Sequence, residues 1–321
     1  MNAVIGVLLA ILVYPGLLVA LLAAWALTWV RSSVFGAAQG RPVSDPLGFP
    51  GAVRTAFDKE GIAPAGVFAP AITVATLVAV VCPLLALIFL PLPGNPMVSA
   101  VGLQGDIIAA GAFLLALPLA RLFVGWVSPS PYTRLAADRN ARLLAGAALP
   151  AALALTAIAQ TFVSLRLDTI TTPASVPTII LITRALAAAA FACALPVLAR
   201  ATTLQQVEHD TPLPSSELGE ISGRHLALFR VGEALQLVAV AAVFVSVFII
   251  PLVSGVTNTG LRYIIWALAI IAVAVGVALW DALRRQAIER AERPPVTWWL
   301  GIPVLLALAA LVAAAWAGRG V

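Results

Sequence analysis

The sequence predicts an all-α, polytopic integral membrane protein, and three observations lead to that prediction. Of the 321 residues, 62% are hydrophobic and only 10% are charged, with a mean hydropathy of +1.04. A soluble domain needs a largely polar surface, which this ratio cannot supply. Apolar runs of about 20 residues recur along the chain, and a helix needs that length to cross a bilayer. The runs are continuous rather than alternating, which favours helices over a β-barrel.

We predict eight transmembrane helices in a single helical domain covering residues 1–321. The spans are expected at 3–30, 64–92, 102–127, 143–163, 175–199, 228–252, 260–281 and 297–317. The first follows no basic segment, so we expect a membrane helix there rather than a cleaved signal peptide. The even number of spans places both termini on the same side of the membrane.

The basic residues indicate which side that is. The connectors 31–63, 128–142, 200–227 and 282–296 hold most of the 19 lysines and arginines, whereas the opposite side has Arg166, Arg262 and Arg319. The positive-inside rule therefore makes those four connectors cytoplasmic loops and puts both termini outside. These loops explain the net charge of +5, so the expected partner is the lipid bilayer and not a nucleic acid. We expect a multi-pass protein of the cell's inner membrane.

Two of the predicted cytoplasmic loops are expected to contain helix. Phe49, Val53 and Phe57 recur every four residues, which predicts a short amphipathic helix at the membrane surface. Residues 282–293 are expected to extend the seventh helix beyond the membrane, until the Pro-Pro pair that follows stops it.

Four charged side chains lie within the predicted spans and are candidates for an intramembrane polar or ion-coupling site. They are Asp106, Arg121, Arg184 and Glu233. A charge inside the bilayer is costly, so each one indicates either a function or a packing ion pair. Arg121 and Glu233 lie at matching depth near the cytoplasmic ends of their spans, so they could pair. Asp106 lies near the outer end of its span, and Arg184 near the middle of its span.

The chain shows no recognisable catalytic group of residues. Its two cysteines, Cys82 and Cys193, are far apart, and its two histidines, His209 and His225, make no metal-ligand pattern. We therefore assign no catalytic residue and no metal ligand, and expect this chain itself to bind no cofactor.

Three groups of short motifs resemble one known family. The first is Gly105-Asp106, then Ser128-Pro-Ser-Pro-Tyr132, then Ala136-Ala-Asp-Arg139; the second is Gln39-Gly-Arg-Pro42, then Phe57-Asp-Lys-Glu60 and Ala69-Pro70; the third is Glu220-Ile-Ser-Gly-Arg-His-Leu-Ala-Leu228. In order, spacing and loop side they are similar to the eight-helix membrane subunit that joins the two arms of respiratory complex I. Its counterparts occur in formate hydrogenlyase and energy-converting NiFe hydrogenases, and the likeness is greater to this hydrogenase branch.

The resemblance implies a membrane-anchor and coupling subunit. In the family, the cytoplasmic loops lie under a hydrogenase-like module with a large subunit and a small iron–sulfur subunit, and redox chemistry is coupled to ion movement in antiporter-like membrane subunits. The residues that would shape the docking surface are Asp58, Glu60, Tyr132, Arg139, Glu217, Glu220 and Arg224. Iron–sulfur clusters, and a NiFe centre in hydrogenase-type assemblies, would belong to the partner subunits, and quinone binding stays open.

One departure from the family and two alternative functions bear on this interpretation. The fourth span has Ala148-Leu149-Pro150 where the family has a glutamate before the proline. A proton relay needs closely spaced titratable groups, and no continuous relay can be drawn here. The alternatives are a quinone-site subunit of a NADH-quinone oxidoreductase and a stand-alone secondary transporter in which Arg184 meets an anionic substrate. The sequence has neither the inverted repeat nor the paired broken helices typical of such transporters.

Overall fold

The computed structural model describes residues 7–9, 11–61, 69–92, 95, 105–171, 178–199, 217–253, 258–289 and 296–317. Within these ranges the chain is helical, and the one β-type contact is an isolated bridge between Asp106 and Arg166. The elements are α2 (Leu17–Ala38), α3 (Gly48–Asp58), α4 (Ala69–Phe89), α6 (Ile107–Val127), α7 (Pro131–Phe162), α8 (Leu167–Thr171), α9 (Thr178–Leu198), α11 (Gly223–Phe244), a π-helical turn η1 (Val245–Ile249), a 3₁₀ turn η2 (Ile250–Val253), α12 (Thr259–Glu289) and α13 (Val296–Ala317).

The predicted class, an all-α polytopic membrane protein, is confirmed. Among the described residues, seven helices are long and apolar enough to cross a membrane. The eighth predicted span coincides with α13, whose apolar part, Gly301–Ala317, is slightly shorter than the other seven. The sidedness of the termini stays a prediction.

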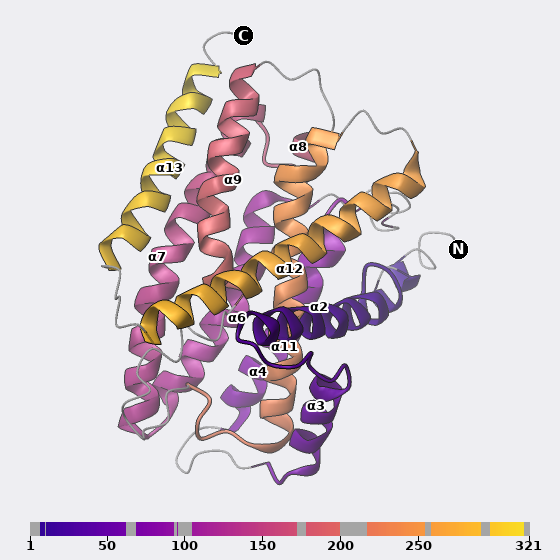
Figure 1. Cartoon of the computed structure of the whole chain (residues 1–321), viewed down its shortest axis with the longest axis vertical. Helices are drawn as coiled ribbons and strands as arrows, with labels where there is room; N and C mark the ends of the chain where they lie inside the picture. Colours follow the sequence, from indigo (N-terminus) through magenta and orange to yellow (C-terminus); the bar gives the residue numbers. More distant parts are fainter. Residues whose placement is uncertain are drawn as a thin grey trace.

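Helix α11 is the centre of the bundle. It packs against α4, α2, α3, α9 and α6, and 78% of its most apolar window is buried. Helices α7, α9 and α13 pack together on one side of the molecule, while α2 and α12 pack against each other and cross the bundle obliquely (Figure 1). The core residues between these helices are mostly alanine, leucine and valine, and the small ones let helix backbones approach closely.

The predicted loop 128–142 is mostly helix, which corrects that part of the sequence interpretation. Only residues 128–130 connect α6 to α7, and α7 begins at Pro131, a residue favoured in the first helical turn. Its 32 residues span about 48 Å, whereas the hydrocarbon core of a bilayer is about 30 Å thick. The excess equals about 12 residues, so the polar stretch 131–142 is the part of α7 that extends beyond the membrane.

The first predicted span, 3–30, is displaced in the structure. The described residues around Pro15 form a turn, α2 begins at Leu17, and it continues to Ala38. The chain then folds back along α2, where Trp25 Nε1 donates to the Pro46 carbonyl at 2.6 Å and Trp29 Nε1 to the Ser44 carbonyl at 2.9 Å. These bonds explain why the helix extends past the apolar run.

The other predicted loops differ in how much of them the structure describes. Within 31–63, the amphipathic helix predicted from the phenylalanine spacing is confirmed as α3, which packs against α11. In 200–227, residues 200–216 lie outside the described part of the chain, and α11 begins at Gly223. In 282–296, α12 continues to Glu289, as predicted, and residues 290–295 lie outside the described part.

Candidate functional site

A buried ionic network lies where the C-terminal half of α6 meets α11. Arg121 of α6 is 4% exposed, and its guanidinium forms ion pairs with two carboxylates, Glu233 of α11 and Glu217 of the turn before α11. The Arg121 Nη2 to Glu217 Oε2 distance is 3.0 Å. The pairing of Arg121 with Glu233 that matching depth suggested is therefore confirmed, and Glu217 joins it as a second anion.

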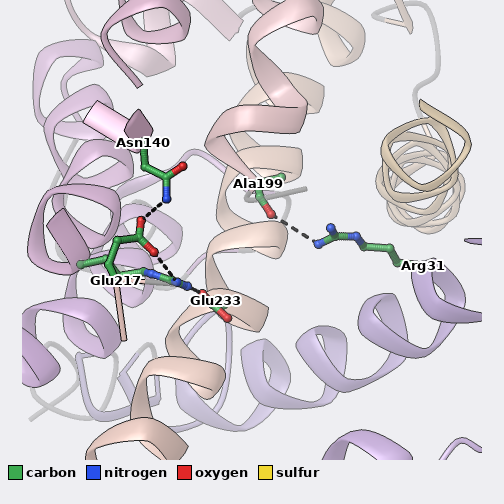
Figure 2. A network of polar contacts seen from close by, with 6 residues as sticks. Arg31, Asn140, Ala199, Glu217 and Glu233 are labelled. Carbon is green, nitrogen blue, oxygen red and sulfur yellow. Dashed lines mark hydrogen bonds and ion pairs between the residues drawn. The ribbon is translucent and has the colours of Figure 1, made fainter. Parts of the chain in front are cut away.

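Asn140 of α7 completes this network. Its Nδ2 donates to Glu217 Oε1 at 2.6 Å, so both oxygens of that carboxylate are bonded (Figure 2). Asn140 and Glu217 are 6% and 1% exposed. A carboxylate buried this completely needs such partners, since an unpaired ion in the interior is strongly unfavourable.

A glycine in α6 lets α7 and the turn that carries Glu217 pack closely against this helix. A Cβ atom on Gly125 would lie 2.8 Å from the Ala137 Cβ and 3.0 Å from the Glu217 Cβ. Real Cβ atoms rarely approach so closely, so only glycine lets α7 and the 217–220 turn come this near to α6. The position of the Glu217 carboxylate thus depends on the glycine at position 125, one helical turn from Arg121.

Glu233 faces a cavity as well as the network. Its side chain is 31% exposed, compared with 4% for Arg121. The cavity has a volume of about 300 Å³, and its charged lining residues are Arg31, Arg230, Glu233 and Asp281. It lies among α2, α3, α11 and α12, beside the end of α9. Glu233 therefore lies between the buried ion pairs and a cavity whose lining combines apolar side chains with four charged ones.

Arg31 and Asp281 close the other side of this cavity. The Arg31 Nη2 to Asp281 Oδ2 distance is 3.3 Å, and Arg31 Nη1 donates to the Ala199 carbonyl at 3.5 Å. This one guanidinium joins α2, α12 and the C-terminal end of α9, and its bond to Ala199 is drawn in Figure 2. Asp281 is 2% exposed, so its carboxylate is a second fully buried anion with an arginine partner.

The three connectors near the network are bonded to one another and form what we call the connector face, residues 60–61, 128–130 and 219–223. Ser128 Oγ donates to the Glu220 carboxylate, and Ser222 Oγ donates to the Glu60 carbonyl at 2.8 Å. Gly223 has a φ of +66°, and a Cβ there would lie 2.6 Å from Gly61 Cα. Glycine is the residue that tolerates both conditions.

Two predicted site residues lie far from this network. Asp106 caps the start of α6, where its Oδ1 accepts from Ile108 N at 2.9 Å; 14 residues of helix separate it from Arg121. Arg184 is 3% exposed, donates to the Ile170 carbonyl at 3.1 Å and lies 5.1 Å from the centroid of the Phe162 ring. Within α9, Arg184 lies six residues after Thr178, and its place in an ion-coupling site stays a prediction.

The predicted docking residues divide into exposed and buried ones. Asp58, Glu60, Tyr132 and Arg224 are exposed, and Arg139 and Glu220 are half-buried. The prediction that Glu217 belongs to the docking surface is wrong, because both its oxygens are bonded in the interior. Sequence reasoning missed Asn140, Arg31 and Asp281. The last two carried a usable signal: opposite charges at corresponding ends of the first and seventh spans.

The fold and this network define a polytopic helical membrane protein with an ionic centre near one membrane surface. A family model described as NADH dehydrogenase matches residues 10–315, so the chain belongs to the NADH dehydrogenase family. It is thus a membrane subunit of the complex I-like class, as the short motifs suggested. No curated protein sequence matched.

A solved structure supports the same fold. The chain is similar to a subunit of the membrane-bound sulfane sulfur reductase, an archaeal respiratory membrane complex, with a TM-score of 0.75 and 19% sequence identity. The alignment covers 98% of this chain and 100% of that one. At this sequence identity the similarity establishes the fold alone. The fold is shared over nearly the whole chain.

Proposed function

We propose that this chain is the membrane-anchor and coupling subunit of a complex I-like or membrane-bound hydrogenase assembly. The observation that carries the proposal is the Arg121–Glu217–Glu233 network, which lies directly beneath the connector face. A redox module docked on that face would sit next to a buried group of charges. Family membership favours such a subunit over a stand-alone transporter.

The chemistry of the network suits the transfer of a proton. One guanidinium, Arg121, is shared by two carboxylates, Glu217 and Glu233. Glu233 is the carboxylate that also meets the cavity, where a proton could reach it. Buried ionisable groups in membrane segments commonly form such proton relays. Movement of a docked partner would act on Glu217 through the connector that carries it.

The proposed partners follow from the two surfaces. The connector face would bind a cytoplasmic hydrogenase-like pair, a large subunit and a small iron–sulfur subunit, which hold the clusters and, in hydrogenase-type assemblies, a NiFe centre. The apolar flanks would meet antiporter-like subunits in the inner membrane. Purification in a mild detergent should recover an iron–sulfur protein together with this chain. Recovery of a stable chain alone would contradict the proposal.

Glu233→Gln tests the coupling role. The amide keeps the size of the side chain but cannot gain and lose a proton, so ion translocation by the purified assembly should fall while the assembly and its electron transfer persist. Asp168→Asn is a suitable control, because Asp168 is partly exposed beside Arg166 and distant from the network. Unchanged ion translocation in Glu233→Gln would reduce Glu233 to a packing residue.

A quinone site is a second candidate function, and the cavity favours it. At about 300 Å³ it is at the lower limit for a ligand pocket, and Arg230 in its lining could donate a hydrogen bond to a quinone carbonyl. A photoreactive quinone added to the assembly should label α2, α3 or α11 if this holds. Labelling confined to other subunits would exclude it.

A further inference from the structure

The polar line does not stop at Glu233, because a second buried polar side chain lies one turn further along α11. Gln236 is fully buried, and its Nε2 donates to the Leu114 carbonyl of α6 at 2.6 Å and to the Leu198 carbonyl of α9 at 3.3 Å. Its Oε1 is buried and has no hydrogen-bond partner.

The orientation of this amide is fixed by its surroundings. Both neighbours of Nε2 are carbonyl oxygens, which can only accept, so the NH₂ group must face them and Oε1 must point elsewhere. A buried acceptor that has lost water and gained no donor destabilises the structure. Such a group is therefore either a source of strain or a place that receives a donor during function.

The donor can come from the side of Glu233. Residues three apart on a helix are neighbours, with Cβ atoms about 5–6 Å apart. Both side chains face α6, since Glu233 pairs with Arg121 and Gln236 bonds to Leu114. A protonated Glu233 has an O–H to donate, and a single water molecule could bridge the two groups.

Beyond Gln236 the path ends. Residues 237–245 are all apolar, and the next polar side chain along the chain is the buried Ser246 of η1, nine apolar residues away. Further along, Phe244 and Phe248 pack against Phe191 of α9, with ring centroids 6.0 and 5.6 Å from that of Phe191. A proton that arrives at this level has no polar group ahead of it on α11.

We propose that Gln236 is a positioning residue that forms the inner end of the polar line: its Oε1 accepts a hydrogen bond from an O–H on the Glu233 side, either the protonated carboxyl or one bridging water. The inference rests on the proposed coupling function. Nε2 holds the amide in place between α6 and α9, and Oε1 holds the proton-bearing group. Gln236 would thereby stabilise the state in which Glu233 has taken up a proton.

The test compares three variants of the intact assembly. Gln236→Met removes donor and acceptor at similar volume and should lower ion translocation per electron about tenfold, the value of one net hydrogen bond. Gln236→Glu keeps both functions only as the protonated acid, with an O–H for one of the two carbonyls and an acceptor oxygen on the other side, so it should retain most of the coupling at low pH and lose it at high pH. Gln160→Met, at an exposed position near the end of α7, should change nothing. Rescue by glutamate separates this role from mere packing.

A high-resolution cryo-EM map of the wild-type assembly, at low and high pH, gives an independent measure. It should show at low pH either the Glu233 carboxyl or a water within hydrogen-bond distance of Gln236 Oε1, which also tells the two donors apart. Full coupling in Gln236→Met together with loss of coupling in Glu233→Gln would overturn the inference alone. Unchanged coupling in Glu233→Gln would overturn the proposed function. If Gln236→Met fails to assemble, a map with no donor at Oε1 still refutes the inference.

Discussion

Arg121 is the residue on which the network depends, because one guanidinium serves two carboxylates from different segments. Removing it would leave Glu217 with Asn140 as the bonded neighbour seen here, and would leave Glu233 facing the cavity. Breaking a buried ion pair from one side costs more than the pair contributes, since the remaining charge is still buried.

We therefore expect Arg121→Met to destabilise the protein by about 3–5 kcal/mol, the typical cost of a broken buried pair. Loss of helical circular dichroism during denaturant titration in detergent would measure it. Arg142→Met is the matched control, since Arg142 is exposed on α7, and it should change stability little. A similar loss in both variants would show that the ion pairs contribute nothing particular.

At the scale of elements, the connectors are held by backbone conformation as much as by side chains. Gly223 begins α11 with a left-handed backbone against Gly61. Through this contact the segment after α3 and the segment before α11 behave as one surface. The contact therefore couples the amphipathic helix to the most buried helix of the bundle.

Gly223→Ala should destabilise the protein by about 1–2 kcal/mol from its left-handed backbone alone, and more from the clash with Gly61. It should also reduce recovery of the cytoplasmic partner. Gly51→Ala, within α3 and with open space around it, should be neutral or slightly stabilising because alanine favours helix. Both effects can be measured by thermal unfolding and by co-purification.

Sequence patterns anticipated elements better than their connections. The apolar runs located the spans, and the spacing of Phe49, Val53 and Phe57 located α3. The polar character of 131–142 was mistaken for loop because helix and loop are equally polar outside a bilayer. The start of α2 was misplaced because hydropathy does not register the turn at Pro15.

The candidate site was predictable in part. Depth within the spans was enough to suggest the Arg121–Glu233 pair, because opposite charges at the same depth in a bilayer are stabilised when they pair. The position of residues within the spans could not predict that Glu217 is buried, because Glu217 lies in a connector. Its burial depends on Gly125 and on the close approach of α7 to α6. Gln236 was not predicted, because the candidates within the spans were selected by charge and glutamine is neutral.

At the scale of the whole molecule, the extension of α7 beyond the membrane gives the connector face an arginine-rich rim. Arg134, Arg142 and Arg224 are exposed there. A partner that fits this rim should present acidic side chains, because complementary charge accelerates association and fixes orientation.

Arg142→Glu combined with Arg224→Glu should weaken partner recovery about tenfold, a modest effect for lost electrostatic steering; Arg134 is left unchanged because its Nε bonds to the Ser128 carbonyl of the connector face. Recovery of the wild-type assembly should fall as salt rises, since exposed charges are screened. Arg166→Glu removes an exposed arginine elsewhere in the chain and should leave recovery unchanged. Recovery independent of both charge reversal and salt would argue for an apolar docking surface.

The bond between Arg31 and Asp281 joins residues 250 positions apart in the chain. Helices enter the membrane in order of synthesis, so α2 waits in the bilayer while α4 to α11 are inserted. Only when α12 arrives does Arg31 gain its carboxylate and the cavity beside Glu233 gain its last wall. Completion of this cavity is thus tied to near-completion of translation, because a chain that ends before α12 lacks Asp281 and the wall that it forms.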